Sequence, residues 1–199
     1  MKQETGNLKH EATAVGKSEF GFWIYLMTDC LLFGSLFATF AVLRNATFGG
    51  PSADEIFSLP FVLLETLILL TSSFTAGLGV LAARAGDKRR TMMWFGLTFL
   101  LGLSFVSLEI NEFASLVREE HSWRVSAFLT SFFTLVATHG LHVTIGLFWM
   151  VILLIRLSRT GLTDIANRRL GLLAMFWHFL DIVWIFIFTI VYLMGVAGV

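Results

Sequence analysis

Residues 20–43 read FGFWIYLMTDCLLFGSLFATFAVL, an apolar run in which Asp29 is the one charged side chain. A helix of about 20 apolar residues crosses the hydrocarbon core of a bilayer, which is about 30 Å thick. The residues before the run are polar and show no apolar core followed by a small-residue cleavage site, so no cleavable signal is expected. The run therefore predicts a membrane-spanning helix that itself directs insertion.

The composition of the whole chain supports a membrane environment. Hydrophobic residues make up 56% and charged residues 14% of the sequence, whereas soluble domains carry about 25% charged residues. So little charge cannot cover a globular surface in water. The formal net charge of zero argues against a nucleic-acid partner, and the single Cys30 excludes a disulfide framework or a Cys-pair metal site.

Further apolar runs of spanning length follow the first one. The connections between them are short and polar, so no linker separates two domains, and Gly49, Gly50 and Pro51 mark a turn before the second run. We predict an all-α polytopic membrane protein with a cytoplasmic tail at residues 1–19 and one transmembrane domain at residues 20–199. Its five helices are expected at residues 20–43, 60–83, 92–113, 125–155 and 170–196.

The orientation follows from the distribution of Lys and Arg, which favours the cytoplasmic side. The tail and the second and fourth connections carry eleven of the 14 basic residues, and Arg44, Arg118 and Arg124 lie on the other side. We therefore expect a cytoplasmic amino terminus and a periplasmic carboxyl terminus.

Several ionisable side chains fall inside the predicted helices. A charge near the bilayer centre costs about 2.5–3.5 kcal/mol on insertion scales, so each such residue marks a polar interaction or a function. Depth divides them into an inner group, a central pair and an outer group. These groups are Asp29, His178 and Asp181; then His139 and His142; then Glu65, Glu109 and Glu112.

Three pairs of these residues have the i, i+3 spacing that places side chains on one helix face: Glu109 with Glu112, His139 with His142, and His178 with Asp181. Helical bundles with a di-metal site use Glu and His at this spacing, at a common depth. Here the glutamates lie outward of the histidines, which favours interhelical hydrogen bonding over a metal site. A proton relay is a further alternative, with Asp29 loading it from the inner surface.

Small residues gather on the second predicted helix and favour its close approach to a neighbour. They are Ser72, Ser73, Ala76, Gly77 and Gly79.

Two motifs resemble the signatures of subunit III of haem-copper oxidases. They are His139-Gly140-Leu141-His142-Val143 and residues 177–184, WHFLDIVW. Residues 21–30 (GFWIYLMTDC), 59–66 (LPFVLLET) and 191–195 (VYLMG) look like the form found in bo-type ubiquinol oxidases. The resemblance covers nearly the whole chain beyond the tail.

This resemblance implies an accessory, non-catalytic subunit of a proton-pumping oxidase in the bacterial inner membrane, which oxidises ubiquinol and reduces oxygen to water. Its partners are subunits I, II and IV, and the haems and copper belong to subunit I. Subunit III of this family binds phospholipid in a cleft and supports assembly and sustained turnover. Asp29 stands where seven-helix relatives carry a buried, carbodiimide-reactive Glu, one methylene longer.

The resemblance also suggests roles for the intramembrane polar residues. Asp29, His178 and Asp181 are expected to contact lipid or subunit I, His139 and His142 to fix the bundle, and the three glutamates to form an outer polar cluster. The chain itself is expected to hold no cofactor and no metal.

Three other functions stay open at this point. The chain could be subunit III of a cytochrome c oxidase, a stand-alone small transporter or proton channel, or a stand-alone membrane enzyme with a di-metal site. Transporters commonly show inverted repeats with broken helices, and none is visible in this sequence.

Overall fold

The computed structural model describes the backbone of residues 2–44, 59–118 and 127–194, and the side chains of residues 19–44, 59–115 and 127–194. Almost all of the described backbone is helical. In chain order the elements are α1 (Lys2–Leu43), α3 (Leu59–Arg84), α4 (Lys88–Arg118), α5 (Ala127–Thr160), α6 (Asp164–Ile187) and the π-helix η1 (Phe188–Leu193).

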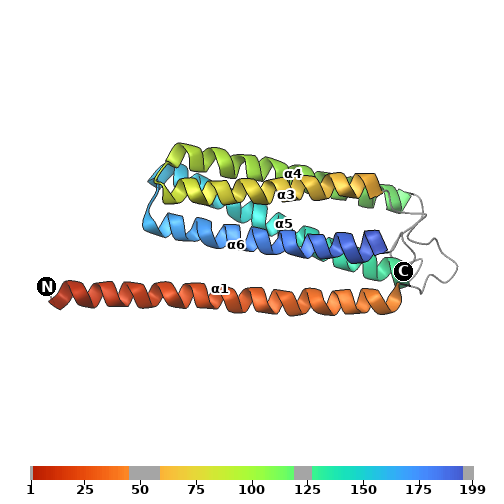
Figure 1. Ribbon diagram of the computed structural model, residues 1–199, viewed down its shortest axis with the longest axis horizontal. Coiled ribbons are helices and arrows are strands. Elements are labelled where there is room, and N and C mark those ends of the chain that lie inside the picture. The colour runs from red at the N-terminus through yellow and green to blue at the C-terminus, as the bar shows by residue number, and fades with distance from the viewer. Residues whose placement is uncertain (1, 45–58, 119–126, 195–199) are drawn as a thin grey trace.

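Within these residues, five helices are long and apolar enough to cross a membrane, which confirms the predicted all-α fold with five spans. They lie side by side along one long axis, with α1 at one edge and its amino-terminal part extending beyond the others (Figure 1). The predicted turn at residues 49–51, the predicted helix start at residue 125 and the predicted helix end at residue 196 lie outside the described residues.

The helices extend further at one end of the bundle than the apolar runs predicted. The predicted third helix began at residue 92, but α4 begins at Lys88, because the Asp87 Oδ1 accepts a hydrogen bond of 3.0 Å from the Arg90 backbone N–H and caps the first turn. Gly86, with φ of 77°, supplies the left-handed backbone that reverses the chain just before it. Apolar length therefore located this helix in the sequence, and a polar cap sets the residue at which it begins.

The turn between α5 and α6 is built in the same way. Gly161 has φ of 76°, and the Thr163 hydroxyl accepts a hydrogen bond of 3.2 Å from the Ala166 backbone N–H to cap α6. The Lys88 ammonium donates a hydrogen bond of 2.9 Å to the Ser158 carbonyl. This bond joins the two turns, which lie at the same end of the bundle (Figure 1).

Two tryptophans of α6 join this helix to α3. The Trp177 indole N–H donates to the Ser72 hydroxyl at 3.0 Å, and the Trp184 indole N–H donates to the Thr66 hydroxyl at 3.1 Å. Both indoles are almost completely buried. Because lipid tails are as apolar as the side chains, helices in a bilayer associate through close packing and hydrogen bonds of this kind.

Glycines make room for the Trp177 ring on two neighbouring helices. A Cβ atom at Gly102 of α4 would lie 2.8 Å from two ring atoms of Trp177, and one at Gly146 of α5 would lie 3.1 Å from a third. The indole therefore fills a slot between α4 and α5 that only the absence of two side chains leaves open.

Helix α1 packs against α5 and, less extensively, against α6. Its buried side chains recur at the helical spacing that forms one face: Leu26, Asp29, Phe33 and Phe40. Large apolar side chains such as Leu31, 76% exposed, point away from the bundle. This pattern is that of a helix with lipid on most of its surface.

We expect Gly102→Ala to destabilise the protein by about 1–3 kcal/mol, because the new methyl group overpacks a fully buried ring that a hydrogen bond holds in place. Thermal unfolding of the purified protein measures this effect. Gly96→Ala on the same helix is the matched control, since a Cβ there meets nothing within 4 Å. If the two variants were equally stable, Gly102 would not be needed to make room for the Trp177 ring.

Candidate functional site

Asp29 of α1 and His142 of α5 face each other inside the bundle. The His142 Nε2 lies 3.7 Å from the Asp29 Oδ2. The other ring nitrogen, Nδ1, lies 2.7 Å from the Thr138 carbonyl oxygen, and since a carbonyl only accepts, Nδ1 must carry the hydrogen. In the neutral ring Nε2 therefore carries the lone pair, and this nitrogen is the one that faces Asp29.

The depth grouping separated these two residues, and the structure brings them together. The Phe33 ring lies 5.3 Å from the His142 ring and helps to close the pair off. The Asp29 side chain is buried, and its Oδ2 has no hydrogen-bond partner. The pair is thus an acid and a base that lie close together inside the bundle, and the Tyr25 side chain is a further neighbour of Asp29.

His178 and Asp181 of α6 meet Ser73 of α3. The Ser73 hydroxyl lies 2.6 Å from the His178 Nδ1, and Asp181 lies close enough to interact with both residues. Asp181 is buried and its Oδ1 has no partner, whereas His178 is exposed on the surface of the bundle. An exposed imidazole at membrane depth indicates a surface that meets something other than bare hydrocarbon.

His139 of α5 occupies an aromatic environment. Its ring lies 5.2 Å from Trp184, 6.1 Å from Phe105 and 6.3 Å from Phe33. The residue is completely buried and neither ring nitrogen has a hydrogen-bond partner. Aromatic rings from α1, α4 and α6 thus enclose His139.

The three glutamates come together at the other end of the bundle from the two turns. Glu65 of α3 interacts electrostatically with Glu109 and Glu112 of α4. The Tyr192 hydroxyl of η1 donates a hydrogen bond of 3.4 Å to the Glu112 Oε2. These four residues are called the outer carboxyl cluster below.

None of these arrangements has the geometry of a metal centre. Within the described ranges, no group of three or more His, Cys, Asp or Glu residues could hold a metal ion. Two of the intramembrane histidines contact polar protein partners, and the third lies among aromatic rings.

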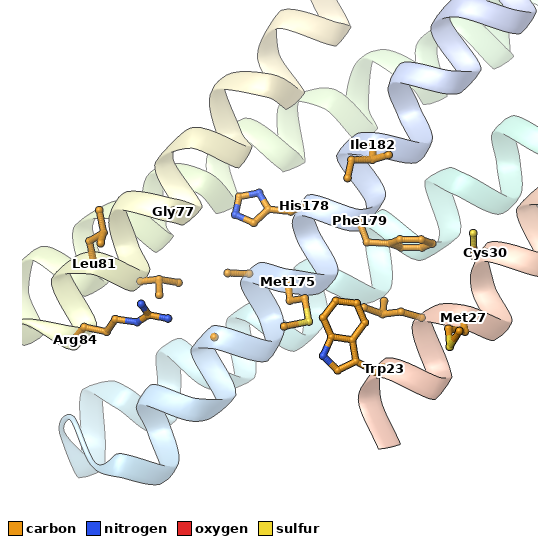
Figure 2. A pocket seen from close by; sticks show the side chains of 14 residues that line it. Trp23, Met27, Cys30, Gly77, Leu81, Arg84, Met175, His178, Phe179 and Ile182 are labelled. Carbon is orange, nitrogen blue, oxygen red and sulfur yellow. The ribbon is translucent and has the colours of Figure 1, made fainter. Parts of the chain in front are cut away.

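A groove of about 620 Å³ opens between α1, α3 and α6. Figure 2 shows Trp23 and Cys30 of α1 on one side and Leu81 and Arg84 of α3 on the other, with His178 of α6 between them. A second hollow of about 390 Å³ shares Trp23 and Arg84 with the groove and adds Arg168. The result is a long apolar groove with two guanidinium groups at the end where the α3–α4 and α5–α6 turns lie.

Sequence reasoning missed this groove and the contacts of Ser73. The sequence feature that could have indicated the groove is the stripe of small residues on α3, and such residues favour close packing of helices equally well. Part of the stripe does pack, since Ser72 bonds Trp177 and Gly79 faces the Phe95 ring of α4. Gly77, however, lines the groove.

The chain was compared with known proteins. A sequence profile described as cytochrome c oxidase subunit III matches residues 1–196. The cytochrome bo(3) ubiquinol oxidase subunit 3 of Pseudomonas aeruginosa is 56% identical over 94% of this chain and 89% of its own length.

Similar proteins of two other names match over comparable lengths. The cytochrome c oxidase subunit 3 of Bacillus sp. strain PS3 is 46% identical over 96% of this chain and 92% of its own. The quinol oxidase subunit 3 of Bacillus subtilis is 49% identical over 89% of this chain and 87% of its own. The five spans and these matches agree, and the chain is a multi-pass membrane protein that belongs to the cytochrome c oxidase subunit III family.

Proposed function

We propose that this chain is the accessory subunit III of a proton-pumping terminal oxidase that oxidises ubiquinol and reduces oxygen to water in a bacterial inner membrane. The identity of 56% with a ubiquinol oxidase subunit 3, over nearly the full length of both chains, carries the proposal. The subunit itself is non-catalytic in this proposal. It supports the assembly and sustained turnover of subunit I and also associates with subunits II and IV.

The polar interior of the chain supports a division of labour in which subunit I holds the haems and copper. A haem iron needs an axial ligand such as a histidine that is free to reach it. Here His142 bonds Thr138 and faces Asp29, and His139 is enclosed by Trp184 and two phenylalanines. These residues fit a role in holding helices together.

The proposed topology places the tail, residues 1–19, in the cytoplasm and the end of the five-helix domain, residues 20–199, in the periplasm. The Lys and Arg count supports it, since the basic connections between α3 and α4 and between α5 and α6 lie at one end of the bundle (Figure 1). The groove end that carries Arg84 and Arg168 is then the cytoplasmic end.

The groove is the proposed binding site for a phospholipid. Its apolar wall suits an acyl chain, and Arg84 and Arg168 at its cytoplasmic end suit a phosphate, which guanidinium groups bind in a bidentate way. His178 and Asp181 belong to the same face, where lipid or subunit I covers them. Asp29 lies deeper, on the inner face of α1.

The second candidate is subunit III of a cytochrome c oxidase, since a subunit of that name is 46% identical to this chain. The two candidates differ in the electron donor of the complex. In both proposals the donor binds to the partner chains, so the donor must be identified on the whole complex.

Detergent extraction of the native protein should bring down larger, haem-bearing chains, and the purified complex should oxidise ubiquinol with oxygen. Optical spectra and oxygen consumption measure both properties. Oxidation of cytochrome c instead, with a copper-ligand set in the accompanying subunit II, would decide for the second candidate. A chain that purifies alone, without haem, would contradict both.

We expect Asp29→Asn to leave haem content and assembly intact but to change the rate of turnover or its decay with time. Asparagine keeps the size of the side chain, so the packing of α1 against α5 is retained, but the carboxyl group that faces His142 is lost. Oxygen consumption followed over many turnovers measures the change. Asp164→Asn, at an exposed position at the start of α6, is the control. If Asp29→Asn matches the wild type in initial rate, decay and proton stoichiometry, Asp29 is only a packing residue.

We expect Arg84→Gln to reduce the phospholipid that copurifies with the complex, with anionic lipids reduced most. Loss of one hydrogen bond to a charged group, worth about 1.5–3 kcal/mol, corresponds to roughly a tenfold loss of affinity or more. Mass spectrometry of extracted lipid measures it. The control is Arg90→Gln, because Arg90 lies at the same end of the bundle, is largely exposed and pairs with Asp87 outside the groove. Equal lipid content in both variants would show that Arg84 does not contribute to phospholipid binding.

A further inference from the structure

The outer carboxyl cluster places two acidic side chains in the interior of the protein and a third, Glu112, in a partly exposed position beside them. Glu65 is 0% exposed and Glu109 is 3% exposed, and Tyr192 is completely buried beside them. They come from three elements, α3, α4 and η1, so no single helix face explains their meeting. The packing of the bundle itself creates this polar site.

Two buried carboxyl groups have oxygens without a hydrogen-bond partner among the residues that the structure describes. Neither oxygen of Glu65 has one, and neither does the Glu109 Oε1. A buried polar atom without a partner costs about 1–3 kcal/mol, and more for a charged group. Three such atoms in one place therefore call for a partner other than the described side chains.

The carboxyl groups do not satisfy each other directly. Glu65 interacts with Glu109 and Glu112 through electrostatics alone, and no hydrogen bond joins their carboxyl groups. The charged groups that act on Glu65 are these two acids, with no basic partner among them. The side chains are thus near enough to interact electrostatically, and their unpartnered oxygens stay open to a bridging species.

Two backbone features lie beside the cluster. Glu109 packs against Gly140 of α5, where a Cβ atom would lie 2.9 Å from the Glu109 Oε2, so the glycine makes room for the carboxyl group itself. Tyr192 belongs to the π-helix η1, and widened turns of this kind occur frequently at functional sites.

We propose that the outer carboxyl cluster is an internal water-binding site, in which ordered water molecules bridge Glu65, Glu109 and Glu112. Water both donates and accepts, so it can serve unpartnered carboxyl oxygens that face one another, and buried waters typically make about three hydrogen bonds. A directly bound metal ion does not fit, because these residues do not form a group that could hold one. Bridging water also gives the three carboxyl groups a route for exchanging protons with one another.

High-resolution electron cryo-microscopy of the purified protein, with whatever subunits accompany it, tests the site directly. The expected result is water density within hydrogen-bond distance of the Glu65 and Glu109 carboxyl oxygens. Three other results would each overturn the proposal. They are a direct hydrogen bond between the carboxyl groups, a density as close to the carboxyl oxygens as a bound metal ion would be, or a side chain of a partner subunit between the carboxyl groups.

Infrared spectroscopy provides a second readout that needs no structure of a variant. On transfer to D₂O, the carboxylic C=O band of the cluster should shift within minutes, because bridging water carries the deuterium to it. Glu65→Gln identifies the band by removing part of it, and Asp29→Asn is the control for a buried acid elsewhere in the bundle. A cluster band that fails to shift over many hours would show that the site is dry.

Discussion

The fold depends on the two indole hydrogen bonds that join α6 to α3. In a bilayer the hydrophobic effect does not drive helices together, so shape and hydrogen bonds must do so. Trp177 and Trp184 supply both, because each ring fills the space between helices and each N–H finds a hydroxyl on α3. With α6 held in this way, α4 and α5 close around the same rings.

This arrangement also determines where the polar groups can lie. The Trp184 ring packs on His139, and Phe33 of α1 contacts both His139 and His142. On another face, α6 lines the groove and presents His178 to it. One helix thus contributes to the aromatic interior, to the attachment of α3 and to the groove.

The number and type of the helices could be predicted from the sequence, because spanning a bilayer requires a length of apolar chain that few other structures contain. The pairing of Asp29 with His142 could not, since depth along a helix says nothing about its rotation or its neighbours. The three glutamates could be grouped by depth, because Glu109 and Glu112 share a face and Glu65 lies at a similar level. Their role stays a prediction. Ser73 and the groove were missed because a small residue has the same appearance in sequence whether it packs or lines a cavity.

The slot around Trp177 has an evolutionary consequence. Gly102, Gly146 and Trp177 lie on three different helices, yet they share one space. The combined volume of their side chains is therefore limited. A side chain gained at either glycine can be accommodated only if the ring becomes smaller, so the three positions should change together among relatives or not at all. Covariation of this kind would come from steric exclusion alone and would carry no information about catalysis, even though the tryptophan stands in the most recognisable motif of the chain.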